Sequence, residues 1–62
     1  MIIDIWPDYE ISDVDRISVF FYPNDGEYRG NMYKDGKAIG DYTAKDSIEL
    51  ENTFPQLTFN WD

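Results

Sequence analysis

The chain has 62 residues, with 13 Asp and Glu against 5 Lys and Arg, a formal net charge of −8, and neither cysteine nor histidine. A chain this short holds one core, so we expect residues 1–62 to form a single domain. It lacks the thiol nucleophile, the imidazole base and the common zinc ligands, which predicts a protein that is not an enzyme and uses no cofactor. The negative charge disfavours nucleic acid and anionic membranes as partners.

The first segment, Ile2 to Trp6, predicts a short strand that ends before Pro7. Its alternation places Ile3 and Ile5 on one face and Asp4 and Trp6 on the other. The start of the chain lacks the positive charge and long apolar stretch of a signal peptide, and no apolar run approaches the length of a bilayer span. We therefore expect a cytoplasmic protein.

An acidic segment of residues 8–15 follows and is expected to be a loop. Its spacing does not match a calcium-binding EF-hand and contains no glycine for the required sharp turn, so a solvated surface is favoured over a metal site. The segment is nevertheless a candidate interaction surface, and its four carboxylates are those of Asp8, Glu10, Asp13 and Asp15.

Residues 16–22 give the strongest strand pattern of the sequence. Both faces carry apolar side chains, which predicts a central strand, or one whose second face is covered by a partner or by the N-terminal segment. The turn residues 23–26 then end the strand, because Pro, Asn, Asp and Gly each favour reversal of the chain. The two faces are Ile17, Val19 and Phe21, and Ser18, Phe20 and Tyr22.

A hairpin is predicted next, with strands over residues 27–34 and 37–42 joined by Asp35-Gly36, a pair typical of a type I′ turn. Gly30 and Gly40 fall inside these strands, where glycine indicates a bulge or the close approach of another group. A two-residue turn predicts the pairs Lys34 with Lys37, Tyr33 with Ala38, Met32 with Ile39, Asn31 with Gly40, and Gly30 with Asp41.

A short helix is expected to begin near Asp46, whose side chain can cap the first turn, and to end near Phe54 because Pro55 cannot continue it. The alternation of Leu57, Phe59 and Trp61 predicts a last strand over residues 57–61. The fold class is therefore α+β. It is a mostly antiparallel sheet of four to five short strands, in the order β-β-β-β-α-β, with one short helix packed on one face.

Strands followed by a helix over residues 16–54 resemble the architecture of several small DNA-binding domains, including the arm-binding domains of integrases. The resemblance covers element order alone and rests on no motif. It implies a sheet inserted into a DNA groove, which the charge of this chain opposes.

Two functions remain open. The first is a non-catalytic module that binds a protein, or a second copy as a dimer, through a strand edge or an aromatic patch that includes Phe20, Tyr22 or Tyr33. The alternative is an acidic inhibitor that mimics nucleic acid, with the carboxylates of residues 8–15 standing in for phosphates, as in some phage-encoded proteins. Carbohydrate binding by Trp6 or Trp61 is a weaker third reading.

Overall fold

A five-stranded antiparallel sheet is the largest unit of the computed structural model, which describes residues 1–61. One α-helix, α1 (Ser47–Thr53), follows the sheet, and a short 3-10 helix, η1 (Ile11–Asp13), lies within the predicted acidic loop. The predicted α+β class is thus confirmed. The strands are β1 (Ile2–Ile5), β2 (Arg16–Ile17), β3 (Phe20–Tyr22), β4 (Glu27–Lys34) and β5 (Lys37–Ala44).

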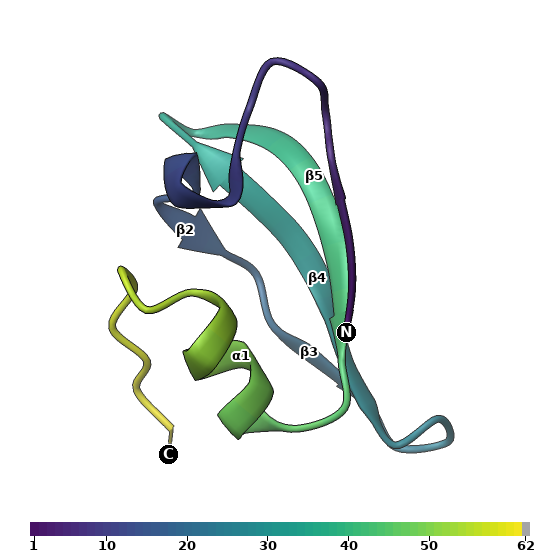
Figure 1. Ribbon diagram of the computed structural model, residues 1–62. Helices are drawn as coiled ribbons and strands as arrows, with labels where there is room; N and C mark the ends of the chain where they lie inside the picture. The colour runs from purple at the N-terminus through teal and green to yellow at the C-terminus, as the bar shows by residue number, and fades with distance from the viewer. Residues whose placement is uncertain (62) are drawn as a thin grey trace.

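The strands lie in the order β1-β5-β4-β2, and β3 also pairs with β4. β2 and β3 together form one edge of the sheet, because both pair with β4 in the same antiparallel register. Figure 1 shows α1 and the C-terminal segment on one side of the sheet, with no described element on the other side. We call the side of the sheet that carries α1 the inner face and the opposite side the outer face.

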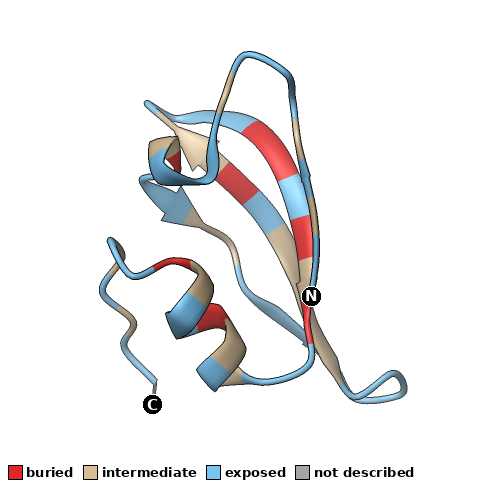
Figure 2. Cartoon of the chain, viewed as in Figure 1, coloured by how far each residue is buried: buried red, intermediate tan, exposed pale blue. Residues whose placement is uncertain are grey.

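The core lies between the inner face and α1, and Figure 2 shows the buried positions on β4, β5 and α1 facing one another. From the helix, Leu50 and the C-cap Phe54 are fully buried, whereas Ile48 points to solvent. The helix begins as predicted, because a carboxylate oxygen of Asp46 accepts a hydrogen bond from the Glu49 N–H at 2.8 Å. The seven buried residues are Val14, Met32, Ile39, Tyr42, Ala44, Leu50 and Phe54.

The edge formed by β2 and β3 is interrupted at Ser18 and Val19. At this point the side chain of Tyr42, on β5, extends across β4 to the edge. The Tyr42 hydroxyl donates a 2.5 Å hydrogen bond to the Ser18 carbonyl oxygen. The Asn31 N–H bonds the Ser18 hydroxyl instead, at 2.9 Å. The Ser18 carbonyl can turn this way because Gly30 has no Cβ, which would collide with it. The prediction of a central strand is therefore wrong, since these residues form a broken edge.

The hairpin turn forms as predicted, with φ values of 51° at Asp35 and 81° at Gly36. The register matches the prediction for the first two pairs and then shifts between Met32 and Tyr33. The later predicted pairs are wrong by one residue, because the extra residue of the bulge lies on β5. The observed pairs are Met32 with Gly40, Asn31 with Asp41 and Gly30 with Tyr42.

The predicted last strand is not formed. Residues 57–61 run on from the helix without pairing to the sheet. The Leu57 N–H bonds the Phe54 carbonyl at 3.1 Å, which turns the chain back over the inner face. Leu57 and Phe59 pack against the core there, so their alternation serves packing rather than a strand ladder.

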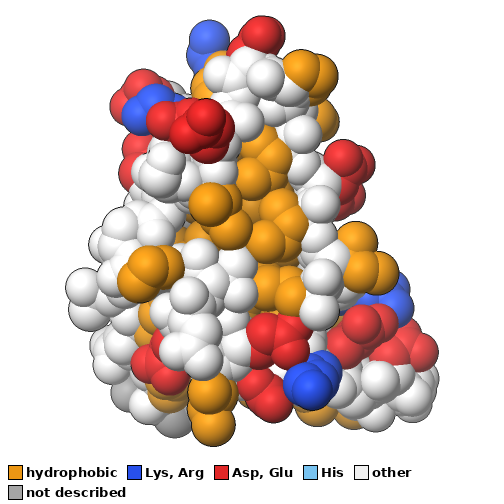
Figure 3. Space-filling model, in the orientation of Figure 1, with side chains coloured by type: hydrophobic (Ala, Val, Ile, Leu, Met, Phe, Trp, Pro, Cys, Tyr) orange, Lys and Arg blue, Asp and Glu red, His pale blue; other side chains and the backbone are white. Residues whose placement is uncertain are grey.

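Seen from the side drawn in Figure 3, hydrophobic side chains form a band down the middle of the molecule, and most acidic side chains lie around it. Among the described residues, no helix combines the length and apolar character that crossing a bilayer requires.

Candidate functional site

The outer face of the sheet carries exposed apolar side chains that no described element covers. Ile2 on β1 is 72% exposed, and Phe20 and Tyr22 on β3 are 59% and 43% exposed. The strand register places Phe20, Arg29, Thr43 and Ile2 in one row across four strands. We call Ile2, Phe20 and Tyr22 the outer apolar patch.

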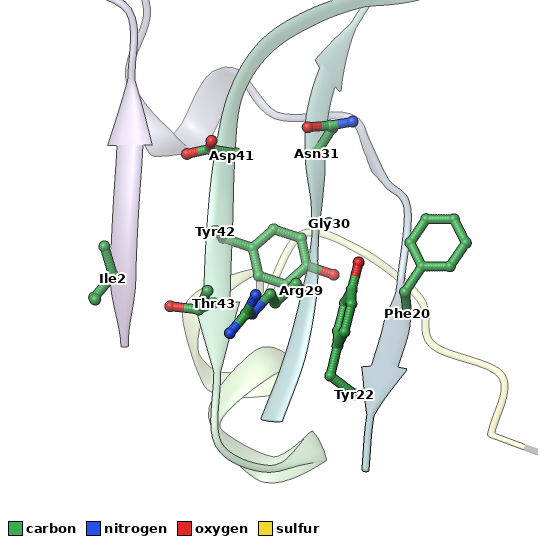
Figure 4. A pocket seen from close by; sticks show the side chains of 9 residues that line it. All are labelled: Ile2, Phe20, Tyr22, Arg29, Gly30, Asn31, Asp41, Tyr42 and Thr43. Carbon is green, nitrogen blue, oxygen red and sulfur yellow. The ribbon is translucent and has the colours of Figure 1, made fainter. Parts of the chain in front are cut away.

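A cavity of about 320 Å³ opens between the members of this patch. Figure 4 looks onto it with α1 behind the sheet, and shows Ile2 on one side and Phe20 and Tyr22 on the other. Its volume lies at the lower end of the range of ligand sites, about 300–1,000 Å³. The lining residues are Ile2, Phe20, Tyr22, Arg29, Gly30, Asn31, Asp41, Tyr42 and Thr43.

Arg29 provides the cationic group of this cavity, and its charge is already engaged within the chain. Its guanidinium lies 2.5 Å from a Glu27 carboxylate oxygen and 2.9 Å from an Asp25 carboxylate oxygen. Its central carbon also lies 4.8 Å from the centre of the Tyr22 ring. The hydrogen bond to Glu27 raises the pKa of Arg29 above its ordinary value. Arg29 therefore holds Tyr22 and the adjacent turn in place, and its charge is not free to bind a ligand in the cavity.

Two carboxylates stand opposite each other next to the cavity. Asp4 on β1 and Asp41 on β5 are direct cross-strand partners, both exposed on the outer face. Like charges in this arrangement destabilise a sheet. Among residues 1–61 neither carboxylate takes part in an ion pair. The pair therefore favours the approach of an external cationic group.

The ring of Tyr42 lies on the inner face of the sheet and packs against Phe54. Tyr42 nevertheless lines the cavity on the outer face, because Gly30 beside it has no side chain. Figure 4 shows its ring passing beside Gly30 toward β3. Burial raises the pKa of Tyr42 to about 12, from an ordinary value of 10.0. The neutral hydroxyl is thus held as a donor to Ser18 over the whole physiological pH range.

This shift predicts a loss of stability at high pH. Between about pH 10 and pH 12 the unfolded chain releases the Tyr42 proton and the folded chain keeps it. The contribution is complete below pH 10 and is lost as the pH rises toward 12. We expect urea unfolding at increasing pH to show this decline in the native protein and a smaller one in Tyr42→Phe. Equal declines would contradict the assignment.

The predicted acidic surface lies at the other end of the sheet, near the hairpin turn. An Asp13 carboxylate oxygen accepts the Glu10 N–H at 2.8 Å, and an Asp15 carboxylate oxygen accepts the Asp35 N–H at 3.0 Å. These two side chains therefore hold η1 and the turn in place. Asp8 and Glu10 are exposed, and neither takes part in an ion pair among the described residues.

The structure brings Phe20 and Tyr22 together but separates them from Tyr33. Tyr33 pairs with Arg16 near the hairpin turn, and the Arg16 guanidinium carbon lies 4.6 Å from the centre of its ring. Sequence reasoning missed Ile2 and Asp41 as parts of the surface. The alternation of β1 already placed Ile2 on the face of Asp4, but the position of Asp41 opposite Asp4 depends on how β1 pairs with β5.

In the part of the chain that the structure describes, no three side chains of the His, Cys, Asp and Glu types are grouped as metal ligands. Neither models of known protein families, nor curated proteins, nor solved structures match this chain. The case for function therefore rests on the chemistry of the surface.

Proposed function

We propose that the protein is a non-catalytic cytoplasmic module that binds another protein through the outer face of its sheet. The observation that carries this proposal is the outer apolar patch on a face that α1 leaves open. Patches of exposed large apolar side chains with a polar rim are typical of protein interaction sites. Aromatic side chains also supply much of the binding energy at such sites.

The charge pattern indicates the chemistry of the partner. Asp4 and Asp41 lie beside the apolar patch without an internal cation, and the whole chain carries a net charge of −8. A partner segment with an apolar anchor next to a Lys or Arg side chain matches both features. Binding is then expected to weaken as salt is raised, because screening reduces the attraction between opposite charges.

The first experiment identifies the partner by placing a photo-crosslinking phenylalanine analogue at position 20. Ile48 provides the matched control, since it is 67% exposed but lies on α1 and away from the outer face. We expect a partner that crosslinks from position 20 and not from position 48. Mass spectrometry of the crosslinked product then names the protein for direct binding measurements.

With that partner purified, the double variant Ile2→Ser and Phe20→Ser is expected to weaken binding at least tenfold. Truncation of a buried contact residue at an interface costs about 1–2 kcal/mol or more, and about 1.4 kcal/mol is a factor of ten. Ile48→Ser is expected to bind as the native protein does. Native affinity in the double variant would show that the outer apolar patch is not the binding surface.

The nucleic-acid mimic remains the alternative function, supported by the exposed side chains of Asp8 and Glu10. It predicts a different set of results in the same assay. Asp8→Asn with Glu10→Gln would abolish binding, DNA or RNA would displace the chain from its target, and the double variant of the outer apolar patch would bind normally.

A further inference from the structure

The two edges of the sheet differ in how they are protected from pairing with other chains. β1 carries Asp4 in its middle and is followed by Pro7, both of which oppose strand addition. The edge formed by β2 and β3 carries one charged residue, Arg16 at its start, and neither a charged residue nor a proline from Ile17 to Tyr22. An edge of this kind is a template for another strand.

The backbone of this edge is available for pairing. The Ser18 N–H donates a 3.0 Å hydrogen bond to the Asn31 carbonyl, so this N–H points toward β4. Backbone direction alternates along an antiparallel strand, and β2 and β3 keep one register with β4 on both sides of the break. The N–H and C=O groups of Ile17, Val19 and Phe21 therefore face away from the sheet.

A groove lies beside this edge on the inner face. It has a volume of about 320 Å³ and separates β2 and Val19 from the C-terminal segment, residues 57–61. Leu57 and Phe59 on one side and Ile17 and Val19 on the other make much of its wall apolar. Phe21, on the same face of β3, is 55% exposed, so the chain has both an apolar groove and an exposed aromatic ring on one edge.

We infer that a second copy of this chain pairs antiparallel with the β2–β3 edge, about a twofold axis at Val19. Val19 then lies opposite Val19 of the second copy, and Ile17 opposite Phe21. Each Phe21 ring enters the groove beside Ile17 of the other copy. The two sheets join into one, and both outer faces lie on the same side of it.

The register follows from which backbone groups are free. Shifting the pairing toward the turn places Pro23, which has no N–H, opposite Ile17 or Val19. Shifting it the other way requires Asp15, whose N–H already bonds the Tyr33 carbonyl at 2.9 Å. The register centred on Val19 avoids both. It also places Arg16 of each copy next to Tyr22 of the other, a favourable contact between a cation and an aromatic ring.

Charge sets the salt dependence of this dimer. Arg16 is the one charged residue of each paired edge, but each copy carries a net charge of −8. Repulsion between the copies is screened by salt, so the dimer is expected to strengthen as salt is raised. The protein partner proposed above has the opposite salt dependence, which separates the two interactions experimentally. The dimer does not depend on that proposed function.

A cysteine at position 19 tests the pairing directly. The native chain has no cysteine, so any disulfide in Val19→Cys must join two copies. Opposed residues of a hydrogen-bonded pair have Cα atoms about 5.5 Å apart, within the range that a disulfide spans. Val19→Cys is expected to oxidise to a covalent dimer much faster than the exposed control Ile48→Cys. If Val19→Cys and Ile48→Cys form covalent dimers at the same rate, at low salt and at high salt alike, the proposal is overturned.

Sedimentation of unmodified chains gives a second, independent test. The native protein is expected to form a dimer whose population rises with salt, whereas Val19→Lys stays a monomer with an unchanged circular dichroism spectrum. Ile2→Lys, an added charge on β1, is expected to keep the dimer. A native monomer under all salt conditions would overturn the dimer while leaving crosslinking from position 20 to a partner intact.

Discussion

Replacing Phe54 with alanine is expected to leave most of the protein unfolded at room temperature. Phe54 is fully buried between α1 and the sheet, and its ring meets Tyr42 edge-on at 5.7 Å. Removing a buried phenylalanine side chain costs about 3–5 kcal/mol. A single core in a chain this short rarely supplies more than about 3–5 kcal/mol. The substitution therefore removes an amount comparable with the whole stability.

Urea unfolding followed by circular dichroism measures this effect. Phe20→Ala is the matched control, because it makes the same change at an exposed site on the outer face. Surface changes of this kind are usually within about 0.5 kcal/mol. A Phe54→Ala protein with a cooperative transition near that of the native chain would show that α1 is not anchored by this ring.

Gly30→Ala is expected to be about as damaging, although it adds only one methyl group. The new Cβ would collide with the Ser18 carbonyl and lie 2.9 Å from the Tyr42 hydroxyl oxygen. Forcing an extra carbon into a packed site costs about 1–3 kcal/mol. Displacing Tyr42 leaves the Ser18 carbonyl without its donor, which costs about 1–3 kcal/mol more. Together these costs approach the stability expected for this length.

A double-mutant cycle tests whether Gly30→Ala loses stability through the contact with Tyr42 and Ser18 or through general strain in β4. In the Tyr42→Phe background the hydrogen bond is already lost, so Gly30→Ala is expected to cost less than it does in the native chain. Asn31→Ala, at the next residue but exposed on the outer face, is the control and is expected to change little. Fully additive effects would contradict a shared contact of Gly30 and Tyr42 with Ser18.

Several elements follow from the sequence because short-range contacts decide them. Asp35-Gly36 specifies the hairpin turn, since both residues adopt positive φ. Asp46 starts the helix through a hydrogen bond three residues along the chain. Pro55 prevents its continuation. Alternation likewise placed Phe20 and Tyr22 together on one face of their strand.

Other features depend on residues that are distant in sequence. The break in the β2–β3 edge includes a hydrogen bond from the Tyr42 hydroxyl, 24 residues beyond Ser18. The pairing of Asp4 with Asp41 depends on how β1 docks on β5, and the bulge on β5 alters the later pairs of the hairpin. These contacts arise from strand pairing, which a pattern within one strand does not encode.

The acidic charge, the lack of cysteine and histidine, the turns and the helix limits were thus properties of the sequence itself. Tertiary structure decided that residues 16–22 lie at an edge, that residues 57–61 pack on the core without pairing, and that Ile2 joins Phe20 on an open face. The physical reason is that a strand pattern specifies which side chains share a face. Which strand lies beside it, and whether anything covers that face, is set by the packing of the whole chain.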